Sequence, residues 1–163
     1  MISDQTRGAI WQGLLDMARW SRYYDAKARR YLLHRNILRI LLAFLGIATG
    51  VTLIDVIPTG FVVAPGLAIL AVTIWDLVVD PGKTAAMLGS VSKDFSDLET
   101  EYRNLWESVY ADRIAEDETV KRSEDIMRRA SAAANRLDIH TDNKTNERCA
   151  VAAYEAEANR YAP

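Results

Sequence analysis

The sequence has few of the residues that carry catalysis or bind metals. Among 163 residues there are two histidines, His34 and His140, and one cysteine, Cys149. There is no Cys-x-x-Cys pair, no glycine-rich phosphate loop and no nucleophile elbow. His140, Asp142 and Cys149 match no zinc spacing, so a surface loop is the expected setting for them. We therefore expect no enzyme activity, no metal site and no cofactor.

Charge is also missing from one long stretch of the chain. Half of all residues are hydrophobic and about a quarter are charged, which are ordinary averages for a globular protein. Between Ile40 and Val79, however, the only charged residues are Asp55 and Asp76, and every lysine and arginine lies outside. An amphipathic helix of a soluble domain would interleave the two classes. The segregation favours a membrane unit with appended helices.

Two apolar segments, residues 37–57 and 61–79, lie on either side of the breaker Pro58-Thr59-Gly60. Each segment is about 20 residues long and apolar on every face, which is typical of membrane spans. The sequence therefore predicts an all-α protein with a two-helix transmembrane hairpin over residues 37–79. The alternative is a hairpin buried in a soluble helical bundle.

Three charged residues set limits on this hairpin. Arg39, Asp55 and Asp76 leave uncharged stretches shorter than the hydrocarbon thickness of about 30 Å, so all three should lie near the interfaces. A carboxylate within a span faces a partner, water or a pore. If the chain folds back at the breaker, Asp76 comes within about one turn of Arg39. An Asp76–Arg39 pair and a ring of Asp76 side chains lining a multi-subunit pore both remain open.

The distribution of basic residues predicts the orientation. They cluster before the first span, whereas the Pro58-Thr59-Gly60 loop carries none; the cluster comprises Arg19, Arg22, Lys27, Arg29, Arg30, Arg35 and Arg39. The positive-inside rule then places both termini in the cytoplasm. A basic segment beside the membrane would also attract anionic lipid headgroups.

Small residues recur within the spans. Gly46 and Gly50 form a small-xxx-small motif in the first span, extended upstream by Ala43. Ala64 and Ala68, or Ala68 and Ala71, offer a matching face in the second span. Such residues let helix backbones approach closely in lipid. Packing within one hairpin and packing between subunits are both open, and the second would make the protein a homo-oligomer.

Heptad seams flank the hairpin on both sides. Mostly apolar residues recur there with spacings of three and four. The first seam is Ile10, Leu14, Met17, Ser21, Tyr24, Ala28 and Tyr31, and the second is Leu88, Val91, Phe95, Leu98, Tyr102, Leu105 and Val109. Folding back at the breaker places the two seams in register and brings Tyr24 opposite Phe95. We expect the flanking cytosolic helices to form an antiparallel coiled-coil-like stalk.

Two further helices are expected beyond this stalk. The first covers about residues 118–137, with an apolar stripe of Val120, Met127, Ala130, Ala134 and Leu137. After a loop at residues 138–143, the second would pack Ala150 or Val151, Tyr154, Ala158 and Tyr161 against the stalk or another subunit. The predicted organisation is an N-terminal basic helix, the hairpin, the heptad helix with its successor, and a loop with a C-terminal helix, over residues 1–36, 37–79, 80–137 and 138–163.

Paired basic residues are candidates for an anionic ligand, because guanidinium groups match phosphate geometry. They are Arg29, Arg30, Lys121, Arg122, Arg128 and Arg129. Solvated helix faces or lipid contacts are the alternative roles. Nothing in the charge distribution resembles a surface for DNA or RNA.

The order of these features resembles the SLATT family, two-transmembrane effectors of bacterial nucleotide-signalling anti-phage systems. The resemblance is carried by Trp20–Arg39 (WSRYYDAKARRYLLHRNILR), by the hairpin around Pro58-Thr59-Gly60 and by Asp97–Trp106 (DLETEYRNLW). It covers about residues 10–160 and contains no catalytic signature. The short uncharged spans and Asp76 depart from the pattern.

The resemblance implies an oligomeric effector that breaches the bacterial inner membrane when a defence signal arrives. It also implies control by a cyclic oligonucleotide, or by the partner synthase that makes it, acting on the cytosolic helices. A non-toxic membrane anchor that docks a soluble partner is the alternative function.

Overall fold

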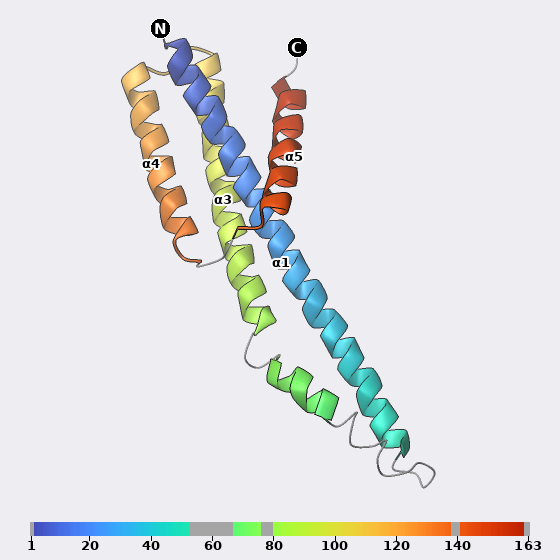
Figure 1. Ribbon diagram of the computed structural model, residues 1–163. Helices are drawn as coiled ribbons and strands as arrows, with labels where there is room; N and C mark the ends of the chain where they lie inside the picture. The colour runs from blue at the N-terminus through green and yellow to red at the C-terminus, as the bar shows by residue number, and fades with distance from the viewer. Residues whose placement is uncertain (1, 53–66, 76–79, 138–140, 162–163) are drawn as a thin grey trace. The chain divides into compact units, whose positions relative to one another are not determined.

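The structure is a computed structural model that describes residues 2–52, 67–75, 80–137 and 141–161. Within these ranges all regular structure is α-helical: α1 (Asp4–Thr52), α3 (Pro81–Tyr110), α4 (Glu116–Ala134) and α5 (Asn143–Tyr161) (Figure 1). Residues 67–75 are also helical. The predicted all-α class is confirmed.

The chain forms two compact units. The bundle unit comprises residues 1–27 and 87–163, and the apolar unit comprises residues 28–86. Helix α1 runs without a break through residues 36 and 37, where the sequence placed the end of the basic helix and the start of the first span.

Local side-chain bonds explain where helices begin. Ser3 caps α1, because its Oγ accepts a hydrogen bond from the backbone N–H of Thr6 at 3.2 Å. Asp80 caps α3 in the same way through the N–H of Lys83 at 3.0 Å, and Pro81 occupies the first helical position, where its missing N–H costs nothing. The segment Asp80-Pro81-Gly82-Lys83 therefore contains the start of α3.

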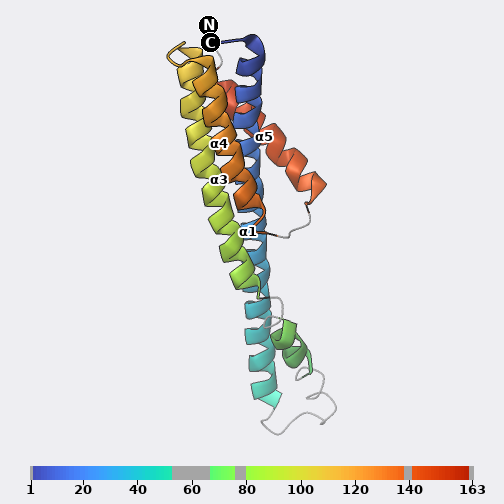
Figure 2. The same cartoon turned by 90° about the vertical axis from the view of Figure 1, so that its left-hand side faces the viewer.

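In the bundle unit α1 and α3 run antiparallel, side by side in both views (Figures 1 and 2). Near the start of α1, Trp11 lies 5.2 Å from Trp106 between ring centroids. Further along, Tyr24 stacks on Phe95 at 5.5 Å. The predicted contact between Tyr24 and Phe95 is confirmed, whereas the coiled-coil character of the pair stays a prediction.

The core of the bundle unit consists largely of the two predicted seams. Ser21 is the exception, being only half-buried, and its carbonyl accepts a hydrogen bond from Ser92 Oγ at 3.0 Å. The buried seam side chains are Ile10, Leu14, Met17, Tyr24, Leu88, Val91, Phe95, Leu98, Tyr102, Leu105 and Val109. Burial of these apolar side chains is the main stabilising contribution in this unit.

Helices α4 and α5 lie on opposite sides of the α1–α3 pair in the bundle unit (Figures 1 and 2). The predicted stripes of both helices are wrong by about one residue. Helix α4 buries Thr119, Ile126, Ala130 and Ala133, and of the predicted stripe only Ala130 is buried. Helix α5 buries Thr145, Cys149, Ala153 and Glu157, whereas Val151 and Tyr154 are exposed.

The apolar unit has almost no core among its described residues. Of the hydrophobic residues described in this unit, only Ala28 and Ala85 are buried. Over the part of the chain that the structure describes, no helix is long and apolar enough to span a bilayer. Of the two expected spans, the described parts are residues 37–52 and 67–75.

Candidate functional site

The first candidate surface is the exposed apolar side chains of the apolar unit. Fractional exposures run from 44% at Leu32 to 69% at Phe44. The set comprises Leu32, Leu33, Ile37, Ile40, Leu41, Phe44, Leu67, Leu70, Ile74 and Trp75. Exposed apolar surface of this density marks an interaction site for lipid or protein.

The predicted hairpin residues fall partly on this surface. Arg39, Ala43 and Gly46 lie exposed on α1, and a Cβ built on Gly46 would meet no atom within 4 Å. Ala68 is half-buried in the helical stretch 67–75, and Gly50 lies in α1. Asp55, Ala64 and Asp76 lie outside the described residues, so neither the Asp76–Arg39 pair nor the pore ring is tested.

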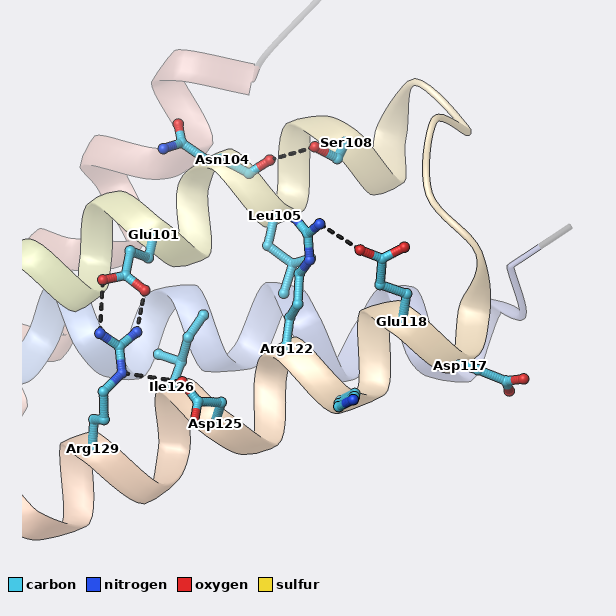
Figure 3. Close-up of a pocket in the computed structure, with 11 residues that line it drawn as sticks. Glu101, Asn104, Leu105, Ser108, Asp117, Glu118, Arg122, Asp125, Ile126 and Arg129 are labelled. Atoms are coloured by element: carbon cyan, nitrogen blue, oxygen red, sulfur yellow. Dashed lines mark hydrogen bonds and ion pairs between the residues drawn. The ribbon is translucent and has the colours of Figure 1, made fainter.

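The second candidate is a groove of about 840 Å³ between α3 and α4 in the bundle unit (Figure 3). Its floor includes the apolar side chains of Leu105 and Ile126. Its other lining residues are polar or charged: Glu101, Asn104, Ser108, Asp117, Glu118, Lys121, Arg122, Asp125 and Arg129. Four carboxylates and three cations thus share one open cleft, and two of the cations, Arg122 and Arg129, are already paired with carboxylates.

Arg129 bridges the two helices that form the groove. Its guanidinium makes a bidentate ion pair with Glu101 of α3, with Nη1 donating to Oε1 at 3.0 Å and Nη2 donating to Oε2 (Figure 3). Its Nε also lies 3.3 Å from Asp125 Oδ2. The hydrogen bond to Glu101 raises the pKa of Arg129 above its ordinary value. Arg129 is therefore engaged by carboxylates of this chain.

The other two cations of the groove differ in their contacts. Arg122 donates to Glu118 one turn earlier on α4, as Figure 3 shows. Lys121 lines the groove and is exposed. A ligand anion would have to displace Glu118 and Glu101 to engage both guanidinium groups.

The structure thus brings together three of the six predicted anion-binding residues: Lys121, Arg122 and Arg129. Arg128 does not line the groove, because its side chain is 79% exposed and pairs with Asp125. Arg29 and Arg30 are exposed on α1 in the apolar unit. The pairing of basic residues along the sequence could not show which of them line the groove.

A buried charge cluster that the sequence analysis missed joins α3 to α5. Glu157 is 1% exposed, and its Oε1 accepts a hydrogen bond from Arg103 Nη2 at 2.9 Å. Arg103 also donates to Glu99 Oε1 at 2.7 Å. Burial acts to lower the pKa of Arg103, but the bonds and charges of Glu157 and Glu99 outweigh it, so the pKa is raised. This charge cluster holds α5 against α3 through ion pairs, because the small buried residues of α5 contribute little apolar area.

No group of three or more His, Cys, Asp or Glu that could hold a metal ion occurs in the described ranges; His140 lies outside them. Asp142 has a structural role instead: its Oδ2 accepts a hydrogen bond from Thr145, and its N–H donates to Tyr23 Oη at 2.8 Å.

Comparisons of the chain with protein-family models, curated proteins and solved structures found no match. The function of the chain is therefore inferred from the two surfaces themselves.

Proposed function

We propose that the chain is a bacterial inner-membrane protein that inserts residues 37–79 as a helical hairpin and acts as a membrane-disrupting effector. The observation that carries the proposal is the contrast between its two units. The bundle unit has a core of buried large apolar side chains, such as Leu14 and Leu88, whereas none of the large apolar side chains described in the apolar unit is buried. Exposed side chains such as Phe44 and Trp75 need a cover, and lipid provides one without a second protein.

Charge supports the same assignment. Arg29, Arg30 and Arg39 precede or border the apolar surface and are exposed. They suit contact with anionic headgroups, and by the positive-inside rule they support a cytoplasmic position for both termini. The bundle unit would then be the cytosolic part that receives a signal, with the α3–α4 groove as the place where an anionic ligand such as a cyclic oligonucleotide acts.

Membrane insertion is tested by fractionation with matched lysine substitutions. Phe44→Lys places a charge in the first span at a cost of about 3 kcal/mol, and it should reduce the fraction that stays in membranes after alkaline carbonate extraction. Val120→Lys is the control, because Val120 is an exposed apolar residue of α4 in the bundle unit. If the wild-type chain were monodisperse in buffer without detergent, the insertion proposal would be wrong.

The effector role is tested separately, by membrane potential during expression in bacteria. The wild-type chain should depolarise the cells, and Gly46→Leu with Gly50→Leu should reduce this effect because leucine blocks close helix approach. Membrane insertion without depolarisation would instead favour a non-toxic anchor that docks a soluble partner. Full toxicity of the leucine variant would contradict the packing role of the glycines.

A further inference from the structure

The outward face of α5 has no cover in the bundle unit. Helix α5 buries one side, so Val151 and Tyr154, one turn apart, point away from α1 and α3 and are each 58% exposed. The sequence predicts that Val151 and Tyr154 pack, with Ala158 and Tyr161, against the stalk or another subunit. Tyr161 does pack on Trp11 and Trp106, whereas Val151 and Tyr154 do not pack within the bundle and are available to a second molecule.

Flanking charges indicate which molecule this is. Arg148 and Glu155 are seven residues apart, so they lie on the same flank of the stripe, one on each side of Val151 and Tyr154. Both are exposed, and within the described part of the chain neither forms an ion pair. Along this flank of α5 a positive residue is therefore followed by the apolar residues and then by a negative residue. Two copies of this pattern attract each other when they lie antiparallel, because each positive residue then lies opposite a negative one.

We propose that two copies of this chain associate through the outward faces of α5, which pack antiparallel about a twofold axis. With the axis between Val151 and Tyr154, each Val151 lies against Tyr154 of the second copy. The same register brings Arg148 opposite Glu155 of the second copy, twice by symmetry. In antiparallel helix pairs residues on equivalent flanks face one another, so this geometry satisfies both the apolar stripe and the charges.

The parallel arrangement is disfavoured by the same residues. It would place Arg148 beside Arg148 and Glu155 beside Glu155, two like-charge contacts in place of two ion pairs. One face of a 19-residue helix is smaller than a standard protein interface of about 1,600 Å², so the dimer should be weak. Confining the chain to a membrane surface would strengthen the dimer, because it raises the effective concentration of the chains. Dimerisation through α5 does not require membrane insertion.

The test exchanges the charges in the full-length chain. Arg148→Glu and Glu155→Arg each convert both ion pairs into repulsions and should weaken dimerisation about tenfold or more. Mixing the two single variants restores opposite charges at both contacts, and the double variant R148E/E155R restores them within one species. Sedimentation equilibrium gives the dissociation constants, in detergent if the chain requires it and otherwise in plain buffer. Glu124→Arg, at an exposed site on α4, is the matched control.

Weakening in both single variants, with recovery on mixing and in the double variant, supports the antiparallel dimer. In a parallel pair like charges already face one another in the wild type, so the single variants would cause no such weakening. A wild-type chain that stays monomeric at all concentrations overturns the proposal, as does loss of association in the single variants without recovery. Association unaffected by either variant would mean that a different surface, such as the apolar unit, joins the copies. Circular dichroism of each variant separates loss of folding from loss of contact. Fractionation with membranes is measured in a separate experiment, so that failure of the proposed membrane insertion can be told apart from failure of the proposed dimer.

Discussion

Tyr102 of α3 lies so close to Gly13 of α1 that any Cβ at position 13 would clash with the tyrosine ring unless the ring moved. A Cβ on Gly13 would lie 2.6 Å from Cε1 and 2.8 Å from Oη of Tyr102. The tyrosine ring is rigid and 2% exposed, and its hydroxyl donates to the Ser123 carbonyl of α4 at 3.4 Å. One glycine thus allows three helices to meet at a single side chain.

We predict that Gly13→Ala lowers the free energy of unfolding by about 1–2 kcal/mol, because overpacking of the ring outweighs the gain in helix propensity. Gly8→Ala is the matched control on the same helix, since its Cβ would meet no atom within 4 Å. This control should stabilise by about 0.5–1 kcal/mol in denaturant titrations followed by circular dichroism. In a Tyr102→Ala background the cost of Gly13→Ala should disappear, and a persisting cost would refute the contact.

The second prediction concerns the buried Glu157. Its replacement by alanine leaves Arg103, whose side chain is 21% exposed, with Glu99 as its remaining carboxylate. We expect a loss of about 1–3 kcal/mol in unfolding free energy, below the cost of a fully orphaned buried charge because Glu99 still compensates Arg103. Denaturant titration of the variant measures this loss in unfolding free energy.

Arg160→Ala provides the control for this charge cluster. Arg160 also approaches Glu157, but at 3.6 Å and with a side chain that is 49% exposed. Such a pair contributes less than about 1 kcal/mol. Equal losses in the two variants would show that Arg103 does not hold α5.

Glu157 also shows why part of the fold was predictable from the sequence and part was not. The seams of α1 and α3 were visible because their buried residues are large and apolar, and Tyr24 and Phe95 meet where the register placed them. In α4 and α5 the buried stripe contains Thr119 and Glu157, which a hydropathy pattern assigns to solvent. Thr119 donates to the Ala115 carbonyl of the preceding turn at 2.9 Å, and Glu157 Oε1 accepts from Arg103 of α3.

The groove could not be predicted from the sequence, for a different reason. Arg129 and Glu101 come from two helices, and their contact depends on how the turn after α3 directs α4. That turn places Asp112 in the left-handed region, with φ of 50°, and is closed by the Arg113 N–H to the Ser108 carbonyl at 2.9 Å. No residue spacing along the chain encodes the partner of Arg129.

A third prediction follows from Glu116 at the start of α4. Its Oε1 accepts hydrogen bonds from the hydroxyls of Ser3 and Thr6, both at 2.6 Å, and these bonds lower the pKa of Glu116 below 4.5. A pKa lowered by folding means that the stabilisation is present above pH 4.5 and is lost as the pH falls through the folded-state value. The difference in melting temperature between the wild type and Glu116→Gln should therefore shrink in acid.

The control for this pH effect is the next residue, Asp117. Asp117→Asn removes an acidic group from the same first turn of α4, where any carboxylate gains from the helix dipole. Thermal melts between pH 7 and pH 3 should show a larger acid-dependent difference for Glu116→Gln than for Asp117→Asn. Identical pH profiles would assign the effect to the dipole and contradict the role of the hydroxyl groups.

The last prediction addresses the groove as a site for anions. In the structure Glu101 and Glu118 occupy the guanidinium groups of Arg129 and Arg122, so an incoming phosphate competes with them. If the proposed signal binds here, Glu101→Gln and Glu118→Gln should each raise the affinity for a cyclic dinucleotide about three- to tenfold, since removing a competing carboxylate frees a cation.

Calorimetry of the full-length chain against a cyclic dinucleotide measures this affinity. Arg129→Ala should abolish the gain, because Arg129 is the bidentate donor of the groove. Arg128→Ala should change nothing, since that side chain is 79% exposed and does not line the groove. Binding should also weaken with salt, because the contacts that form are between charges at an open surface. Absence of heat for both glutamine variants would exclude the groove as the nucleotide site, while the membrane assignment would still depend on the exposed side chains around Phe44.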